Sequence, residues 1–532
     1  MNTKALKQKI LDLAIHGKLL PLEKVEKIRK EEPASVLLEK IRAEKQEKIA
    51  KGELKKDKND SFIFVGDDKR HYEKFADGSV KDIEDEIPFE LPDGWSWVRG
   101  SEILSQMTSR KPTGDFFNYI DIDAIDNKKH KIKQPKKIKV SDAPSRASRE
   151  LFSGDILFSL VRPYLENIAF ISTEFENCIA STGFFVCRPN GNIFPKYLYF
   201  LLISKYVISG LNEFMKGDNS PSISSDDIIK FFFPLPPLSE QKLIVAEIEK
   251  IFAQIDLLEQ NKTDLQTAIK QAKSKILDLA IHGKLVSQDP NDEPASVLLE
   301  KIRAEKEAKI AKGELKRDKN DSYIYKSSTD NCHYQKNADG SIINIEDEIP
   351  FEVPESWCWC RFGEICEFIG GVSYKKNDIT NTGIRILRGG NIQAGKIIDE
   401  IDDVFVPFSY FDKNNSVYEN DIVLVASTGS NLLIGKTGFA YKNLQNTQIG
   451  AFLRIIRTDN SFYAKYNNIV LLSEYYKTYI RNIAGGTNIN NVKTEYLSNF
   501  LFPLPPLTEQ TRIVAKIEEL FTLLDNIQNN LI

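Results

Sequence analysis

The chain has 532 residues, of which 41% are hydrophobic and 28% charged, and its formal net charge is −4; these values predict a foldable protein of several domains. The sequence contains no run of about 18 uncharged apolar residues, and its start, MNTKALKQKI, lacks the apolar stretch of a signal peptide. We therefore expect no membrane segment, no export and a cytoplasmic location. Six scattered cysteines exclude a disulfide framework, whereas the net charge leaves a local basic surface for DNA possible.

Five sequence blocks occur twice in the same order, which indicates a duplicated unit. They are KILDLAIHGKL (9–19 and 275–285), EPASVLLEKIRAEK (from Glu32 and Glu293), KGELK (from Lys51 and Lys312), IEDEIPFE followed by W-x-W (from Ile83 and Ile345), and FPLPPL-[ST]-EQ (from Phe233 and Phe502). Residues 98–232 and 360–501 are nearly equal in length but show little similarity to each other. Two variable segments therefore stand in two copies of one constant frame.

This repeat predicts seven parts along the chain. They are an N-terminal helix of a conserved coiled coil (1–20), a conserved helical and linker region (21–94), a first variable domain (95–238), a central conserved spacer helix (239–285), a repeated conserved helical and linker region (286–356), a second variable domain (357–507) and a conserved C-terminal helix (508–532).

The central helix carries the strongest periodic signal. Its apolar residues from Ile244 to Leu279 recur at alternating steps of four and three, and only Lys262 interrupts them. Such a heptad stripe predicts a helix of about 65 Å that needs a partner helix. The C-terminal stretch matches its first half and the N-terminal stretch its second half. We predict a long antiparallel coiled coil in which the central helix pairs with both terminal helices laid end to end, giving a pseudo-twofold cyclic repeat. Alternatively, each stretch packs as an ordinary amphipathic helix on its own domain.

The variable segments mix short strand patterns with helix, so we expect an α+β protein with two α/β domains. Strands are predicted at 155–160, 168–171 and 183–187 in the first segment and at 421–426, 438–441 and 452–456 in the second. Helices are predicted at 195–208 and 463–483. Residues 95–238 carry a net charge of +3 and residues 357–507 a net charge of +2, so the basic residues concentrate in the variable domains.

Seven lysines crowd around His130 between Lys128 and Lys139, in a pattern suited to phosphate contacts or to a plain solvated loop. Loops with Arg, Asn, Ser and Gly suit base-edge contacts, although each could be an ordinary surface turn. These loops are LVRPYLEN (160–167), GDNSPSIS (217–224), RGGN (388–391), ASTGSN (426–431) and GGTNINN (485–491). The candidate DNA contacts are Arg110, Lys111, Lys129, Lys131, Arg162, Tyr164, Asn219 and Ser222 in the first domain, and Lys376, Arg388, Asn391, Ser430, Asn488 and Asn490 in the second.

The motifs of catalysis are missing. The loop GSNLLIGKT, from Gly429 to Thr437, has five residues between its glycines where a phosphate-binding loop needs four. No dinucleotide fingerprint, adenine methyltransferase signature, catalytic triad or metal-ligand spacing occurs, and Cys358, Cys360 and Cys366 fit ordinary thiols. His16 and His282 each precede a glycine that ends a predicted helix, which indicates capping or a contact with a partner rather than catalysis. The enzyme alternative, a fused nuclease or NTPase, depends on the near-miss loop alone.

The repeated P-L-P-P-L-x-E-Q block, each time followed by V-A-x-I-E, together with the cyclic repeat closely resembles the specificity subunit of type I restriction-modification systems, over essentially the whole chain. The resemblance implies a non-catalytic subunit that binds double-stranded DNA. Each variable segment would be a target recognition domain for one half of a bipartite site, and the coiled coil would set the spacer. Two adenine methyltransferase subunits and the restriction subunits would be the partners. S-adenosylmethionine, ATP and Mg²⁺ would belong to those partners, and no cofactor to this chain. A protein-binding scaffold with two interaction domains is the alternative from another class.

Overall fold

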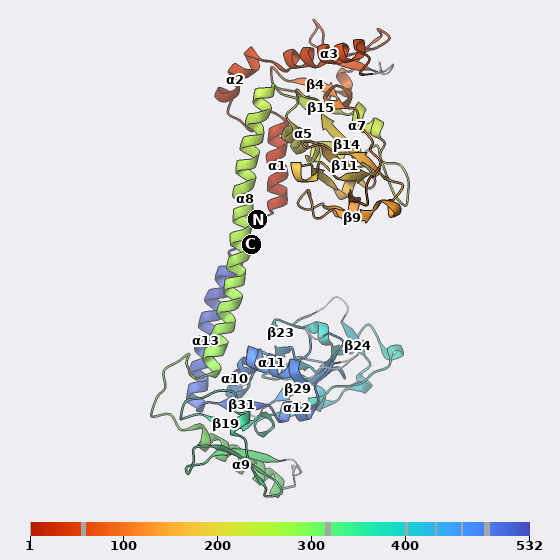
Figure 1. Cartoon of the computed structure of the whole chain (residues 1–532). Helices are drawn as coiled ribbons and strands as arrows, with labels where there is room; N and C mark the ends of the chain where they lie inside the picture. Colours follow the sequence, from red (N-terminus) through yellow and green to blue (C-terminus); the bar gives the residue numbers. More distant parts are fainter. Residues whose placement is uncertain are drawn as a thin grey trace. The chain divides into compact units, whose positions relative to one another are not determined.

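The computed structural model describes residues 2–54, 60–313, 321–399, 403–430, 433–458, 461–483 and 490–531. The chain forms two compact units, Met1–Asn261 and Lys262–Ile532, so the boundary falls inside the central helix. Each unit combines half of a long helix, a constant frame and one variable domain (Figure 1).

The long helices pair antiparallel within each unit. Helix α8 (Leu238–Ile281) is a single helix of 44 residues, about 66 Å long. In the first unit its start lies beside α1 (Thr3–Ile15), where Lys7 forms an ion pair with Asp256. In the second unit its end lies beside α13 (Leu507–Asn529), where Lys273 forms an ion pair with Asp525. The predicted antiparallel pairing is confirmed inside each unit.

Burial along α8 differs between its ends and its middle. Ile244, Ile248, Ile255, Ile269 and Leu277 are buried. In contrast, Leu258 and Leu265 are 54% and 40% exposed, so the heptad stripe is not covered at these two positions. The reason is the length of the partner helices. Helix α1 begins only four residues before Lys7, and α13 ends only four residues after Asp525.

The repeated W-x-W and FPLPPL blocks pair with each other to form the base of each long helix. Strand β4 (Ser96–Arg99) pairs antiparallel with β15 (Phe232–Leu235), and β19 (Cys358–Arg361) pairs in the same way with β31 (Leu501–Leu504). Proline follows each second strand, where it ends the pairing and suits the first turn of a helix. The next elements are therefore α8 and α13, each beginning at the leucine of the block.

A buried carboxylate then joins each long helix to its frame. Glu240 and Glu509 are 1% and 0% exposed and lie in the first turns of α8 and α13, where the helix dipole favours negative charge. The Trp95 Nε1 atom donates a hydrogen bond of 3.0 Å to Glu240, and the Trp357 Nε1 atom donates one of 2.9 Å to Glu509. Arg29 adds an ion pair of 2.6 Å to Glu240.

The two histidines of the rod repeat have the capping role that the sequence predicts. Nδ1 of His16 lies 2.8 Å from the backbone oxygen of Asp12, and Nδ1 of His282 lies 2.7 Å from that of Asp278. Each ring packs on a phenylalanine of the IPFE block, with centroids 4.1 Å from Phe89 and 4.0 Å from Phe351. These contacts tie the rod repeat to the IPFE repeat.

Each constant frame also holds a small sheet that the sequence did not predict. The helices are α2 (Leu22–Glu31), α3 (Ala34–Ala50) and α9 (Ala295–Ala311). The three-stranded antiparallel sheets are β1 (Ser61–Val65), β2 (His71–Phe75) and β3 (Val80–Asp82), and β16 (Ser322–Lys326), β17 (His333–Asn337) and β18 (Ile342–Asn344). Regions 21–94 and 286–356 are therefore mixed rather than only helical and linker.

The variable domains are built on strands β11 (Ile156–Ser159) and β25 (Ile422–Val425), both fully buried and both central in a sheet. The order β12-β11-β14-β5 contains β12 (Ile168–Phe170), β14 (Phe184–Pro189) and β5 (Leu104–Ser105). The order β20-β29-β25-β27-β23-β22 contains β20 (Glu367–Gly370), β29 (Leu453–Arg457), β27 (Thr437–Phe439), β23 (Gly395–Ile397) and β22 (Ile392–Gln393). The six predicted strands are confirmed.

A second sheet accompanies each of these. In the first unit its order is β10-β13-β6-β9, with β10 (Ala147–Glu150), β13 (Ile179–Ser181), β6 (Phe116–Ile120) and β9 (Lys136–Lys139). In the second unit its order is β24-β21-β28, with β24 (Val404–Val406), β21 (Ile384–Leu387) and β28 (Thr447–Ile449). A hydrophobic cluster of each domain joins residues of both sheets, and the larger cluster of each unit reaches the long helices.

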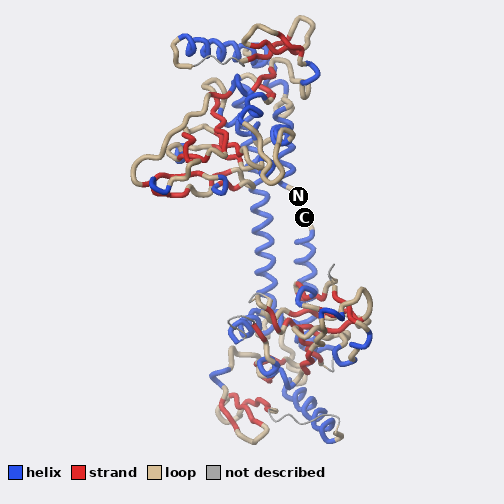
Figure 2. The backbone as a smooth tube through the Cα atoms, turned by 90° about the vertical axis from the view of Figure 1, so that its right-hand side faces the viewer, coloured by secondary structure: helices blue, strands red, loops and turns tan. Residues whose placement is uncertain are grey.

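The predicted single helices of the variable domains are wrong, because each is broken at a serine. They form α5 (Pro195–Leu202) with α6 (Lys205–Asn212), and α10 (Ser461–Leu472) with α11 (Glu474–Ile483). The hydroxyls of Ser204 and Ser473 each donate 2.6 Å to the carbonyl three residues earlier, and Ser204 caps α6. Figure 2 shows the helices of the first domain beside the long helix pair, with the strands beyond them.

Among the described residues, no helix combines the length and apolar character needed to cross a bilayer.

We expect Glu240→Ala to destabilise the first unit by about 3–5 kcal/mol, because it leaves Arg29 and the Trp95 indole buried without their acceptor. Urea unfolding followed by tryptophan fluorescence measures the change. Glu249→Ala is the matched control, since the pair of Glu249 with Lys196 is exposed and should contribute less than about 1 kcal/mol to stability. Equal effects of the two variants would contradict the role of the buried carboxylate.

Candidate nucleic-acid interface

An aspartate–arginine pair fixes the amino end of the central strand in each variable domain. Asp155 forms an ion pair of 2.9 Å with Arg188, and Asp421 forms one of 2.6 Å with Arg457. Both aspartates are 1% exposed. The arginines come from the neighbouring strands β14 and β29, so each pair joins two strands at the same place.

The turn before each aspartate has the same form in both domains. It reads FSGDI at 152–156 and YENDI at 418–422, and the third residue is left-handed in each, with φ 93° at Gly154 and 70° at Asn420. The first residue donates its backbone N–H to the aspartate, and its ring lies under the arginine at 4.3 Å for Phe152 and 4.8 Å for Tyr418. The two variable domains therefore share a framework that their overall sequences do not show.

The candidate loops gather at the opposite, carboxyl end of the central strand, which we call the loop edge. In the first unit the N–H of Ile223 donates 2.9 Å to the carbonyl of Leu160. In the second unit the N–H of Val492 donates 2.8 Å to the carbonyl of Ala426. The loop after the central strand and the loop before the FPLPPL block are thus joined in the same way in both units. The predicted loops 160–167 with 217–224, and 426–430 with 490–491, lie together.

Four candidates of the first unit meet at its loop edge. The backbone of Val161 forms a β-bridge with Ser222, and the Arg162 guanidinium donates 3.1 Å to the carbonyl of Asn219. Arg162 and Glu166 are both left-handed, with φ 48° and 57°, and the turn between them holds Tyr164 45% exposed. Such uncommon backbone conformations in non-glycine residues often occur at functional sites.

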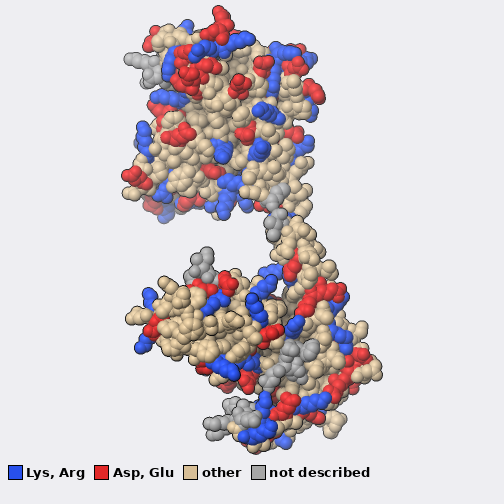
Figure 3. All heavy atoms as spheres, turned by 180° about the vertical axis from the view of Figure 1, so that it is seen from behind, with Lys and Arg blue, Asp and Glu red and all other residues tan. Residues whose placement is uncertain are grey.

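The lysine run forms part of the same surface. Lys129 and Lys131 are exposed and flank His130, whose Nε2 lies 3.7 Å from the Glu166 carboxylate. Burial lowers the pKa of His130, so near neutral pH the ring carries little charge. Lys136, Lys137 and Lys139 continue the run along β9, and basic side chains gather on the lower edge of the first unit in Figure 3. The seven lysines of the run are all exposed.

Arg110 and Lys111 lie elsewhere, in a hollow of about 450 Å³ beside the second sheet. The Arg110 guanidinium donates a hydrogen bond of 3.1 Å to the carbonyl of Asn177, just before the start of β13. The loop edge lies beyond the other end of β13. The ammonium of Lys137 lies 5.2 Å from the ring centroid of Phe116, which is 49% exposed. The candidates of the first unit therefore form two clusters.

In the second unit, strands β26 (Ser427–Thr428) and β30 (Asn490–Asn491) pair, which places Ser430 and Asn490 in adjacent loops. Arg388 follows β21 and is half-buried. Lys376 is exposed on a short helix whose Asp378 accepts a hydrogen bond from the Tyr410 hydroxyl. Asn488 lies outside the described residues.

The structure corrects the prediction that Asn391 contacts DNA. It is fully buried, its amide donates 2.7 Å to Asp403 and 3.2 Å to the carbonyl of Ile398, and its oxygen accepts from the Arg388 N–H at 2.8 Å. Both ends of the amide are used inside the domain. Asn391 therefore shapes the Arg388 turn and does not reach a base.

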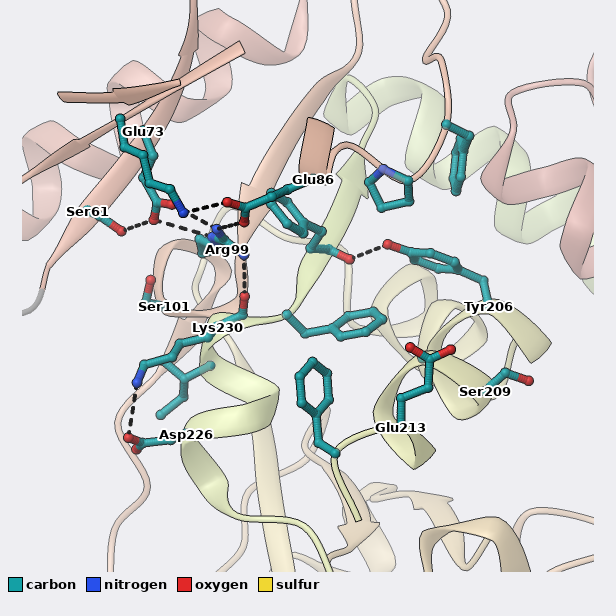
Figure 4. A pocket seen from close by; sticks show the side chains of 18 of the residues that line it. Ser61, Glu73, Glu86, Arg99, Ser101, Tyr206, Ser209, Glu213, Asp226 and Lys230 are labelled. Atoms are coloured by element: carbon teal, nitrogen blue, oxygen red, sulfur yellow. Dashed lines mark hydrogen bonds and ion pairs between the residues drawn. The ribbon is translucent and has the colours of Figure 1, made fainter. Parts of the chain in front are cut away.

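A larger hollow of about 1410 Å³ separates the constant sheet of the first unit from its variable domain (Figure 4). Arg99 lies at its centre, with ion pairs to Glu73 at 2.8 Å and Glu86 at 3.7 Å, and it donates 2.7 Å to the carbonyl of Lys230. The counterpart Arg361 contacts Glu348, Gln335 and the carbonyl of Asn499 in the second unit. These arginines tie each constant sheet to its domain.

The near-miss phosphate loop lies between strands β26 and β27, without the following helix that such a loop needs. Over the described parts of the chain, no three His, Cys, Asp or Glu residues come together as metal ligands. Burial raises the pKa of Cys358 to about 11, in keeping with an inert thiol.

Comparison with known proteins identifies the duplicated domains. A family model described as "Type I restriction modification DNA specificity domain" matches residues 92–267 and 354–532, which is more than half of the chain and once in each repeat. The chain belongs to the type I restriction-modification DNA specificity family. The family confirms the resemblance seen in the sequence, and with it two recognition domains separated by a long helix.

The relatives span almost the whole chain. The specificity subunit of the type I restriction enzyme EcoAI from Escherichia coli is 29% identical, covering 97% of this chain and 88% of the relative. The HsdS subunit from Thermoanaerobacter tengcongensis is similar in fold, with 24% identity, a TM-score of 0.50 and coverage of 83% and 93%. A chain from a structure on complex assembly of a type I system has 24% identity, a TM-score of 0.57 and coverage of 84% and 94%.

We expect Asp421→Ala to destabilise the second recognition domain by about 2–3 kcal/mol, because it leaves the Arg457 guanidinium, only partly exposed, without its carboxylate. Chemical unfolding measures this loss. Asp399→Ala is the matched control, since the Asp399 side chain is 92% exposed and its pair with Arg385 should contribute less than about 1 kcal/mol. A loss no larger than that of the control would contradict the role of the pair.

Proposed function

We propose that this chain directs a type I restriction-modification complex to a bipartite DNA site, each recognition domain contacting one half. The observation that carries the proposal is the loop edge. Both units place their candidate loops at the same end of the same strand, with the same backbone hydrogen bonds but different side chains. One framework with two sets of side chains suits two different half-sites.

The first loop edge offers Arg162, Tyr164 and Asn219, and the second offers Ser430 and Asn490, with Arg388 beside it. Arginine pairs well with guanine and asparagine with adenine, and each good pair discriminates by about 1–3 kcal/mol. Lys129 and Lys131, together with Arg110 and Lys111 in the separate hollow, would contact phosphates and provide salt-dependent affinity. Lys376 would do the same in the second domain.

The duplicated constant frames would bind two adenine methyltransferase subunits, and restriction subunits would join for cleavage. Support comes from the equivalent Arg99 and Arg361 networks and from the solved relative whose title names the assembly of a type I system. S-adenosylmethionine, ATP and Mg²⁺ would be bound by those partners and not by this chain. The complex would act on DNA in the cytoplasm.

Exchange of one variable segment tests the two-reader arrangement. Replacing residues 98–232 with the segment of a related subunit should change one half of the methylated motif and leave the other half unchanged. Methylation sequencing of DNA from cells that express the chain with its methyltransferase partner gives both motifs. An unchanged motif would exclude the first domain as a reader and favour a protein-binding scaffold.

A second test concerns the spacer. Removing residues 259–265, one heptad in the exposed middle of α8, shortens the helix by about 10 Å, close to three base pairs. Residues 526–532, which follow Asp525 at the end of the C-terminal helix, are removed with it, because the two terminal helices laid end to end must be shortened by the same seven residues as α8. We expect both half-sites to persist in methylation sequencing with a spacer shorter by about three base pairs. A normal spacer would contradict the role of α8 as a ruler.

A further inference from the structure

Phe452 is an apolar side chain in an unusual place on the second recognition domain. It is 68% exposed, although the residues after it, in β29, are mostly buried. Single exposed apolar residues are common on protein surfaces, so exposure alone assigns no role. The position and rigidity of the turn that carries Phe452 are what distinguish it.

The main chain of this turn is held on several sides. The carbonyl of Phe452 accepts the N–H groups of Ala426 at 2.9 Å and Ser427 at 3.0 Å. The N–H of Gly450 donates 3.0 Å to the carbonyl of Leu387. A methyl group added at Gly371 would lie 2.1 Å from the oxygen of Gly450, so the two chain segments approach there as closely as glycine allows. The turn therefore presents its side chain from a fixed backbone.

These same contacts place Phe452 among the candidate loops. Ala426 and Ser427 begin the loop that leads to Ser430, Leu387 precedes Arg388, and the bridge from Gly450 to Val372 reaches the segment before Lys376. Two loops predicted from the sequence to contact DNA, and the segment that leads to the candidate Lys376, thus converge on the turn that carries Phe452. The sequence analysis missed Phe452 as a DNA contact because it assigned this residue to the start of the predicted strand 452–456.

The first unit has glycine at the equivalent position. The carbonyl of Gly183 accepts the N–H of Leu160 at 2.9 Å, as that of Phe452 accepts the N–H of Ala426. The first loop edge instead exposes Tyr164 and Leu165, on the loop after the central strand. An aromatic group in this position is therefore a property of the second reader alone and is not needed by the shared framework.

We infer that Phe452 is a specificity-determining residue, which makes an apolar contact with the bases of the half-site bound by the second domain. The inference rests on the proposed function. A base edge in the major groove offers one apolar group, the methyl group of thymine, and an aromatic wedge in the minor groove contacts the faces of a base step. Both are contacts between an apolar side chain and a base, and both depend on the shape of that side chain.

The test compares Phe452→Ala and Phe452→Leu with Tyr441→Ala in the complex with the methyltransferase partner. Tyr441 is 64% exposed but lies next to the amino end of β25, so it is a matched exposed aromatic away from the loop edge. Binding is measured on duplexes that carry every single-base change in both half-sites of the wild-type motif. A further set replaces each thymine of the second half-site with deoxyuracil, which lacks the methyl group.

Phe452→Ala should lower affinity for the wild-type site on the order of tenfold, a loss typical of one base contact. It should also flatten base preference at one or two positions of the second half-site only. Phe452→Leu should retain part of the preference, and Tyr441→Ala all of it. Sensitivity of the wild type to deoxyuracil, lost in Phe452→Ala, identifies the methyl contact, whereas insensitivity identifies the wedge.

An unchanged preference profile in Phe452→Ala, or an equal loss on all duplexes, would overturn the inference. The proposed function fails in a different way, because the wild-type complex itself would then show no base preference in the second half-site. Misfolding is recognised from loss of preference in the first half-site or loss of binding to the methyltransferase subunit.

Discussion

Each unit depends on a carboxylate buried at the first turn of its long helix. Glu240 and Glu509 accept hydrogen bonds from tryptophans of the W-x-W block, so the helix, the strand before it and the constant frame meet at one point. Burial raises the pKa of Glu509, because removal from water disfavours the charged form. Hydrogen bonds and the helix dipole offset that cost, and the repeated P-L-P-P-L-x-E-Q block encodes this arrangement.

The recognition domains separate stability from recognition along a single strand. At the amino end of β11 and β25, an aspartate, an arginine and an aromatic ring lock two strands together. At the carboxyl end, loops from distant parts of the sequence meet through backbone hydrogen bonds. The rigid end positions the variable end, because the buried strand between them is only four residues long.

Periodicity and repetition were predictable from the sequence, since both are local patterns. The antiparallel helices and the six strands follow from them, whereas the meeting of the candidate loops was seen only in the structure. Ser204 and Ser473 were not predictable as helix breaks, because serine is tolerated inside helices and only the tertiary packing selects the break. Asn391 was misjudged because an exposed turn and a buried one share the same residues. The FSGDI and YENDI turns stand 266 residues apart in the sequence. Only the structure shows that Arg188 and Arg457 pair with the aspartates of these turns.

The joining of the recognition loops by backbone groups has an evolutionary consequence. Almost any residue can supply a carbonyl, and every residue but proline an N–H, so mutation of these loops leaves their attachment intact. Even a proline can provide such an attachment, because the carbonyl oxygen of Pro221 accepts a hydrogen bond from the backbone N–H of Arg162. Recombination between related genes could therefore exchange loops, and selection for new sites could proceed, without renewed selection for folding. The drift of the two segments to little mutual similarity is the outcome that such a scaffold permits.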